Sequence, residues 1–287
     1  MPGGPSGRRA GRVVVVGSIN VDLVTRVRRL VRPGETILGR GLDRLAGGKG
    51  ANQAVAARAA GAEVLMSGCV GDDAGGRAYL SRLTARGIDC AQVRTEAGEP
   101  TGHALICVAD DGENAIVVIP GANGRVGEQE ALPDDLMPGD VVVVQLEIPT
   151  ETVVSVVRRA SSRGARVVVN LSPYAALPPD VIAAADPVIV NEHEASLLAD
   201  SELVPTSLLV TFGAAGAAWD GAQETGTPVP AQDVVDTTGA GDAFCGALAA
   251  ALAAGADRAA AMAAALAAGA EAVRSAGAQP DPHLRQG

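Results

Sequence analysis

Residues Asp236-Thr237-Thr238-Gly239-Ala240-Gly241-Asp242 lead directly into an alanine-rich run, Ala243 to Ala254, that is expected to be helical. Glycines before a helix leave backbone N–H groups accessible, and the first helical turn carries unpaired donors and a partial positive charge. Such a helix start binds anions, phosphate above all. Asp242 would place a carboxylate at the same point, where it could take a proton from an attacking hydroxyl. The stretch therefore suggests phosphoryl transfer to an alcohol.

The sequence leaves the role and the pKa of Asp242 open. The residue could be only the N-cap of the helix, because Asp is a preferred capping residue. If it is instead a base, the helix N-terminus and its N–H groups are expected to keep the carboxylate ionised, with a low pKa.

The composition limits the class of protein. With 287 residues, 47% of them hydrophobic but only 2% aromatic, the chain can build a large core from Val, Leu, Ile and Ala. Its net charge of −10 argues against nucleic acid as a partner. Four cysteines without CxxC spacing predict reduced thiols and a cytoplasmic protein, and three dispersed histidines form no zinc pattern.

Neither end of the chain predicts a targeting or membrane segment. Residues 1–12 are rich in Gly, Pro and Arg without an apolar stretch, which predicts a disordered leader and no signal peptide. The alanine-rich C-terminal third is interrupted by Gly255, Asp257 and Arg258, so it predicts two helices that do not enter a membrane.

Short apolar runs alternate with helical segments along most of the chain. The runs are residues 13–16, 64–66, 141–144, 167–169, 187–190 and 208–210, and the helical segments include 51–60, 76–86, 150–163 and 180–185. This alternation predicts an α/β fold, with a doubly wound, mostly parallel sheet and helices on both faces.

Two segments break the alternation. Residues 23–45 contain strand-like pieces around Pro33-Gly34, and two apolar pieces flank the turn Asp110-Asp111-Gly112-Glu113. These segments predict a small antiparallel β sheet set apart from the main one. Such a sheet could serve as a lid over a pocket or as a protein-binding edge.

Polar residues follow several of the predicted strands. Ligands of open α/β sheets bind at the carboxyl ends of strands, so these side chains are expected to share one crevice, although each could instead cap a helix or shape a turn. They are Asn20, Asp22, Glu147, Asn191 and Glu194. Lys49, with Asn52 one helical turn later, could bind a polyol or lie on the surface, and Gly213-Ala214-Ala215-Gly216 is a further candidate backbone cradle.

Two motifs together resemble those of the ribokinase (PfkB-type) family of carbohydrate and nucleoside kinases, over nearly the whole chain from Val13 to about Asp281. They are Gly47-Gly48-Lys49-Gly50-Ala51-Asn52-Gln53-Ala54 and the stretch from Asp236 to Asp242. The resemblance implies ATP-dependent phosphorylation of a sugar, with the O5 hydroxyl of D-ribose favoured and ribose 5-phosphate as product. A kinase for another sugar or a nucleoside, or a non-catalytic sugar-binding relative, are the alternatives. The scarcity of aromatic residues disfavours a nucleoside.

The resemblance also implies a role for each matching residue. Asp242 would be the base, with the anion hole formed by Gly239, Ala240 and Gly241. The sugar would be bound by Asn20, Asp22, Gly48, Lys49, Asn52 and Glu147. The nucleotide would be lined by Asn191, Thr211, Gly213, Ala214, Ala215, Gly216 and Gly241. Glu194 would organise Mg²⁺ through water, and a monovalent cation, K⁺, would lie near Asp236, Thr238, Ala272, Ser275, Gly277 and Asp281.

The resemblance further implies the domain organisation and the assembly. The α/β domain would comprise residues 13–22, 48–101 and 124–287, and the lid residues 23–47 and 102–123. Relatives of this type bury the lid in a homodimer. One departure is the short stretch 199–207, where relatives usually carry a full helix. Another is Ala214 and Ala215 in place of longer polar residues, and both departures predict weaker nucleotide binding.

Overall fold

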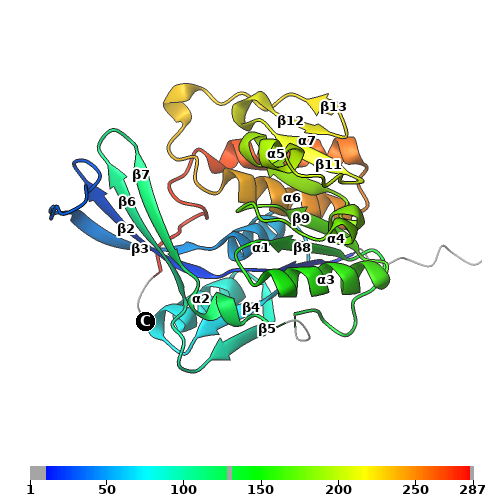
Figure 1. Cartoon of the computed structure of the whole chain (residues 1–287), viewed down its shortest axis with the longest axis horizontal. Coiled ribbons are helices and arrows are strands. Elements are labelled where there is room, and N and C mark those ends of the chain that lie inside the picture. Colours follow the sequence, from blue (N-terminus) through cyan, green and yellow to red (C-terminus); the bar gives the residue numbers. More distant parts are fainter. Residues whose placement is uncertain (1–10, 128–130, 285–287) are drawn as a thin grey trace, which may run out of the picture.

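The computed structural model of the protein describes residues 11–127 and 131–284 (Figure 1). Most of the predicted leader therefore lies outside the described residues. None of the helices in the described ranges is long and apolar enough to cross a membrane.

The main sheet has nine strands in the order β13-β12-β11-β10-β9-β8-β1-β4-β5. Those from β11 to β5 pair in parallel, and β12 and β13 are added antiparallel at one edge. The strands are β1 (Val13–Val16), β4 (Val64–Gly71), β5 (Asp89–Glu96), β8 (Val141–Gln145), β9 (Arg166–Asn170), β10 (Val188–Asn191), β11 (Leu208–Thr211), β12 (Ala217–Trp219) and β13 (Ala222–Glu224). The all-valine β1 is fully buried at the centre, as expected for a parallel strand covered on both faces.

Helices cover both faces of this sheet, as the alternation of segments predicts (Figure 1). One face packs against α1 (Lys49–Ala59), α2 (Ala74–Ala85), α6 (Ala240–Ala253) and α7 (Arg258–Ala272). The other packs against α3 (Thr150–Ser162), α4 (Pro179–Ala184) and α5 (Glu192–Ala199). Short 3₁₀ turns are η1 (Gly121–Arg125), η2 (Gly213–Ala215) and η3 (Ala231–Asp233). The fold class is that of the sequence prediction.

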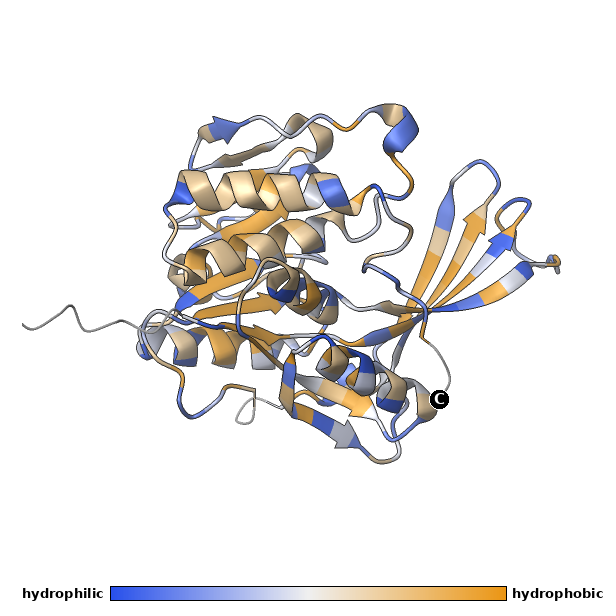
Figure 2. Ribbon diagram, turned by 180° about the vertical axis from the view of Figure 1, so that it is seen from behind, coloured by the Kyte–Doolittle hydropathy of each residue, from blue (hydrophilic) through white to orange (hydrophobic). Residues whose placement is uncertain are grey.

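A second sheet projects from the main body (Figures 1 and 2). Its four strands, in the order β3-β2-β6-β7, are β2 (Asn20–Val27), β3 (Arg40–Gly47), β6 (Gly102–Ala109) and β7 (Asn114–Ile119). The outer pairs are antiparallel hairpins, as predicted, but the central pair β2/β6 is parallel. Local turns determine only the pairing within each hairpin, whereas β2 and β6 come from two separate excursions of the chain and pair in parallel.

Two residues assigned to the predicted leader belong to the folded domain. The Gly11 N–H donates to Ala253 O, and Arg12 is only 8% exposed. The Arg12 guanidinium pairs with Asp140 at 3.4 Å and with Asp135 at 2.5 Å. The Arg-rich composition of the segment suggested that Arg12 is solvated. The carboxylates that neutralise its charge lie more than 100 positions away in the sequence, so the sequence did not predict its burial.

The crossover between β10 and β11 is short. The helix α5 occupies its first part, and residues 200–207 follow without a helix or strand. Val204 in this segment is 83% exposed. The absence of a second helix here agrees with the sequence, and the consequence for nucleotide binding stays a prediction.

The Arg12 pair provides a test of where the folded domain begins. We expect Arg12→Met to lower the free energy of unfolding by about 2–4 kcal/mol, because the mostly buried Asp140 carboxylate would lose its cation. Arg77→Met, which removes an exposed partner of Asp72, is the control and should cost less than about 1 kcal/mol. Urea denaturation of both variants measures the difference, and equal midpoints would show that Arg12 is not part of the fold.

Candidate active site

The helix α6 begins one turn earlier than the alanine-rich run suggested. Its N-cap is Gly239, with φ of 79°, and a Cβ there would lie 2.5 Å from Ala278 Cα. Glycine is thus needed both for the left-handed conformation and for the close approach. Asp242 is the third helical residue, so the alternative that it is merely the N-cap is wrong.

The Asp242 carboxylate faces the start of α1. Its Oδ2 accepts a hydrogen bond from Asn52 Nδ2 and its Oδ1 accepts one from Gln53 Nε2, each at 2.9 Å. Asp242 is 7% exposed, Asn52 6% and Gln53 fully buried. Gln53 is in turn held by Gln145, whose Nε2 donates to Gln53 Oε1 at 2.7 Å. The carboxylate is therefore fixed in one orientation by two amide donors.

The electrostatics of Asp242 differ from the expectation. Burial raises its pKa, and the opposing effects of Lys49, Asn52 and Gln53 do not cancel this, so the net direction is upward. The prediction of a low pKa counted the helix N-terminus but not the loss of solvent, which sequence alone does not reveal. A raised pKa makes the carboxylate a better proton acceptor.

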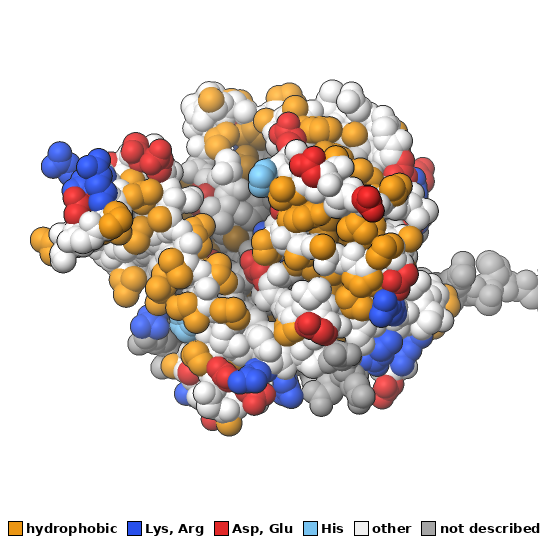
Figure 3. All heavy atoms as spheres, viewed as in Figure 1, with side chains coloured by type: hydrophobic (Ala, Val, Ile, Leu, Met, Phe, Trp, Pro, Cys, Tyr) orange, Lys and Arg blue, Asp and Glu red, His pale blue; other side chains and the backbone are white. Residues whose placement is uncertain are grey.

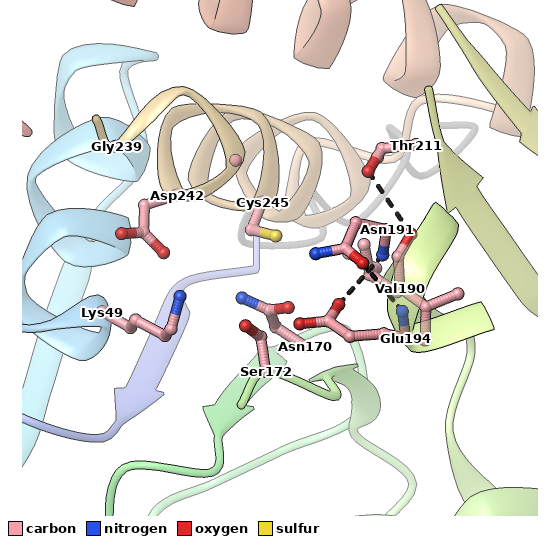
Figure 4. A pocket seen from close by; sticks show the side chains of 12 residues that line it. Lys49, Asn170, Ser172, Val190, Asn191, Glu194, Thr211, Gly239, Asp242 and Cys245 are labelled. Carbon is pink, nitrogen blue, oxygen red and sulfur yellow. Dashed lines mark hydrogen bonds between the residues drawn. The ribbon is translucent and has the colours of Figure 1, made fainter. Parts of the chain in front are cut away.

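Lys49 is the only lysine in the chain. Burial lowers its pKa, but the carboxylates of Asp242, Glu147 and Glu194 more than offset this effect, and the pKa is raised. Its ammonium group points into the pocket beside Asp242 (Figure 4). A permanent positive charge therefore stands among carboxylates in a chain of net charge −10.

On one side of Asp242, the ends of β1 and β8 form a cluster of polar groups. Glu147 Oε2 accepts hydrogen bonds from Ser18 Oγ at 2.5 Å and from the Lys49 N–H at 3.0 Å. Asn20, 3% exposed, accepts a hydrogen bond from Asn123 Nδ2 at 2.7 Å. The structure thus brings the predicted sugar-binding residues Asn20, Lys49, Asn52 and Glu147 to one place, and a Cβ at Gly48 would lie 2.7 Å from the Asn20 nitrogen.

Asp22 lies on β2 in the same cluster, and its Oδ1 is buried without a hydrogen-bond partner among the described residues. Burial, together with the charges of Glu147 and Asp242, raises the pKa of Asp22 to about 7. A buried acceptor without a donor is costly and calls for an explanation. A ligand hydroxyl that donates to this oxygen would provide one.

On the other side of Asp242 lies a pocket (Figure 4). The predicted residues that line it are Lys49, Asn191, Glu194, Thr211, Gly239, Gly241 and Asp242, and Asn170, Ser172, Ile189, Val190 and Cys245 line it as well. Lys49 and Asp242 border both this pocket and the polar cluster, so the two half-sites meet at these side chains.

The anion hole predicted at residues 239–241 is only partly free. The Ala240 N–H donates to Thr237 O at 3.3 Å, which occupies that group in a turn. The N–H groups of Gly241 and Asp242 belong to the first turn of the helix, where backbone donors have no intrahelical partner. Gly241 lines the pocket, so these groups are placed to bind an anion there.

Asn191 and Glu194 form a capping box at the start of α5. Asn191 Oδ1 accepts from the Glu194 N–H at 2.8 Å, and Glu194 Oε2 accepts from the Asn191 N–H at 2.9 Å. No group of three or more acidic, His or Cys side chains within the described ranges could hold a metal on its own. Mg²⁺ commonly keeps several waters and binds through one or two carboxylates together with substrate phosphates, so the lone Glu194 carboxylate fits that ion if the pocket holds phosphates.

The residues predicted for a monovalent cation come from two loops that contact each other. Asp236 Oδ1 accepts from the Thr238 N–H and its Oδ2 from the Gly277 N–H, both at 2.9 Å. The Ser275 N–H donates to Ala272 O, and Asp281 has a positive φ of 46° just before Pro282, whose Cγ would lie 2.9 Å from a Cβ at Gly277. The residues of η2, Gly213–Ala215, are exposed, and of this loop only the preceding Thr211 reaches the pocket.

Sequence reasoning missed several polar residues of this centre: Ser18, Gln53, Tyr79, Asn123, Gln145, Asn170, Ser172 and Gln279. Gln53 stood inside a quoted motif beside Asn52 but was given no role. The others come from strands, loops and α2, and only the fold brings them together.

Comparison with known proteins identifies the family of the chain. The pattern of the pfkB family carbohydrate kinases matches residues 10–284, and the chain belongs to that family. It is 40% identical over 282 residues to ribokinase of Bacillus subtilis (strain 168), covering 93% of this chain and 94% of that protein. Ribokinase of Schizosaccharomyces pombe is 36% identical over 272 residues, 85% of this chain and 86% of that protein.

A solved structure is similar along almost the whole chain. Arabidopsis thaliana ribokinase complexed with ribose and ATP superposes with a TM-score of 0.83 at 30% identity, covering 96% of both chains.

The pKa of Asp22 leads to a prediction about stability. The pKa in the unfolded chain is about 4, so the folded state holds the proton more tightly between that pH and about 7. Stability associated with protonated Asp22 is therefore full below pH 4 and is lost as the pH rises to about 7. We expect Asp22→Asn, which cannot ionise, to be increasingly more stable than the native protein across this window.

Thermal melts of both proteins at pH 4.5, 6 and 8 measure this effect. The difference in Tm in favour of Asp22→Asn should grow from the first pH to the last. A constant difference would contradict a raised pKa at Asp22.

Proposed function

We propose that the protein transfers the γ-phosphoryl group of ATP to the O5 hydroxyl of D-ribose, giving ribose 5-phosphate and ADP. The observation that carries this proposal is the buried Asp242 carboxylate between a hydroxyl-binding cluster and an anion pocket. The membership in a carbohydrate kinase family and the two ribokinase relatives support the choice of reaction and sugar.

In this proposal Asp242 orients the sugar hydroxyl and accepts its proton as the O5–phosphorus bond forms and the bond from phosphorus to the ADP oxygen breaks. Its raised pKa suits this role, because a base is most effective when its pKa lies closer to the working pH. The amides of Asn52 and Gln53 keep the acceptor oxygens in place while the substrate exchanges.

Sugar recognition is assigned to Asn20, Asp22, Gly48, Lys49, Asn52 and Glu147. The unpartnered Asp22 Oδ1 would accept a hydrogen bond from a ribose hydroxyl. A site of this kind rejects a ligand that leaves its polar groups unpaired. Lys49, which borders both half-sites, would neutralise charge on the transferred phosphoryl group.

ATP would lie along the ends of β10 and β11, with its phosphates at Asn191, Gly239 and Gly241 and its nucleoside near Thr211 and residues 213–216. Mg²⁺ would be held by Glu194 through water and by the phosphates, where it supplies charge neutralisation. K⁺ would bind where Asp236 joins the loops of Thr238 and Gly277, and so stiffen the backbone that leads to Gly239. The four cysteines form no disulfide among the described residues, which suits a reducing, cytoplasmic location.

The experiment that tests the proposal is an ADP-release assay against a panel of sugars and nucleosides with ATP, Mg²⁺ and K⁺. We expect D-ribose to give the highest kcat/KM, with 2-deoxyribose, fructose and adenosine clearly lower. A higher kcat/KM for one of the others would change the substrate assignment. No turnover of any panel member, together with measurable ribose binding, would indicate a non-catalytic sugar-binding protein.

Replacing Asp242 tests the base. Asp242→Asn is expected to lower kcat by about 10²- to 10⁴-fold, the usual cost of losing a general base. The new amide also turns one N–H group toward the donors Asn52 and Gln53, so its orientation is no longer fixed. The control is Asp257→Asn, because Asp257 is a true N-cap whose side chain accepts from the Ala260 N–H. Asp242→Asn turnover close to that of the control would refute the mechanism.

The lid suggests a homodimer. All six residues of β7 are exposed, and apolar side chains are visible along the lid in Figure 3. They include Ile116 (52%), Val117 (60%) and Val118 (50%), with Leu105 (41%) on the neighbouring strand. An exposed apolar edge strand invites pairing with another chain, so we propose that two lids, through residues 103–119, cover each other.

Charge introduced on β7 tests this assembly. We expect the native protein to be a dimer at micromolar concentration and Val117→Lys with Val118→Lys to be monomeric, as measured by light scattering. Val204→Lys, at an exposed apolar residue outside the lid, is the control and should stay dimeric. A native monomer with full activity would exclude the proposed interface.

A further inference from the structure

Gln279 lies behind the active site and is buried, with 2% of its surface exposed. It follows the turn that ends α7 and belongs to none of the half-sites described above. Its Nε2 donates to Asn52 Oδ1 at 2.9 Å and to the Tyr79 hydroxyl at 2.7 Å, while its Oε1 accepts from Arg82 Nε at 3.3 Å. Every polar atom of this side chain is thus engaged.

Arg82 and Tyr79, at the outer ends of this network, determine which end of the Gln279 amide donates and which accepts. Arg82 can only donate, so it requires the Gln279 oxygen on its side. The Tyr79 hydroxyl gives its single hydrogen to Gly47 O at 2.6 Å, a group that can only accept, and therefore has to accept from Gln279. Both constraints place the Gln279 NH₂ group toward Asn52.

The orientation of the Gln279 amide in turn determines the orientation of the Asn52 amide in the active site. Because Gln279 donates to Asn52 Oδ1, the Asn52 amide has to turn its NH₂ group toward Asp242 Oδ2. With the amide reversed, two oxygens would face each other at the same 2.9 Å separation. The Gln53 arm has no such anchor, because it ends at Gln145, whose Oε1 is buried without a partner among the described residues.

We propose that Gln279 is a positioning residue for the phosphoryl-transfer base: it sets the orientation of the Asn52 amide and thereby keeps a hydrogen-bond donor on Asp242. The inference rests on the proposed role of Asp242. Tyr79 and Arg82 of α2 act through Gln279, so a helix that lines neither half-site contributes to the orientation of the base.

The variant Gln279→Met tests the proposal, because it keeps the length of the side chain and removes its hydrogen bonds. We expect kcat for D-ribose to fall about 10- to 100-fold, the cost of one misplaced hydrogen bond to a charged group, with KM for ATP within twofold of the native value. Loss of a donor also favours the protonated carboxylate. The acid limb of kcat against pH should therefore move to higher pH by about half a unit to one unit.

The pH profile separates positioning from a loss of folded protein, since a smaller folded fraction lowers kcat without moving the limb. The other titratable groups that interact electrostatically with Asp242 are Lys49, Glu147, Asp22, Tyr79 and Cys245, and the variant leaves all of them in place. The matched control is Arg86→Met. Arg86 donates to Pro280 O at 2.5 Å from the same end of α2 but is not one of the described hydrogen-bond partners of the Gln279 amide, so its profile should be native.

A double-mutant cycle with Asn52→Ala completes the test. If Gln279 acts through Asn52, adding Gln279→Met to Asn52→Ala should change kcat less than threefold. An unmoved acid limb in Gln279→Met, or the same loss of kcat in both backgrounds, would overturn the proposal. A native protein without ribokinase activity would instead refute the proposed function, which the substrate panel detects before any variant is made.

Discussion

The carboxylate of Asp242, buried where the first turns of α1 and α6 meet, is the interaction on which the site depends. Two amides can reach it only because these helices pack closely. A Cβ at Gly246 would lie 2.4 Å from Gln53 O, so any larger residue there would push the helices apart. The same packing covers the central strands of the sheet. Catalytic geometry and the core therefore share one contact.

The distribution of charge around this contact resolves a difficulty posed by the composition. A chain with a net charge of −10 repels ATP at long range, so local groups have to hold the phosphates. Lys49 is the one ammonium group available, and three carboxylates keep it charged. In the proposed mechanism, its position between the half-sites would allow a single cation to contact both sugar and phosphate.

The sequence predicted the features that depend on local pattern. The valine runs indicated the parallel strands, and the glycines before Asp242 indicated that a helix begins close to that residue. Features that depend on tertiary environment were not predictable. The low pKa expected for Asp242 was wrong because burial outweighs the helix N-terminus. The parallel pairing of β2 with β6 lies beyond what turn signals can define.

The missed residues have a common physical character. Gln53, Gln145 and Gln279 are neutral amides, each 2% exposed or less, and an amide in a sequence normally indicates a solvated surface. Here the orientation of one amide determines the orientation of the next, because each has one accepting and one donating end. A carboxylate in the same position has two accepting oxygens and would not determine the orientation of its neighbours. An apolar residue would leave the neighbouring polar groups unpaired.

Such a chain of amides carries a cost in stability, since each buried polar group has to be satisfied. Within the described residues, the buried side-chain atoms without a hydrogen-bond partner are Asp22 Oδ1 and Gln145 Oε1. Both atoms belong to residues of the active centre, Asp22 within the sugar-side cluster and Gln145 behind Gln53. If Asp22 finds its partner in the sugar, ligand binding repays part of the cost of folding. The Asp22→Asn variant should then be more stable and bind ribose less tightly, which is the pattern expected when a site is unsatisfied until its substrate arrives.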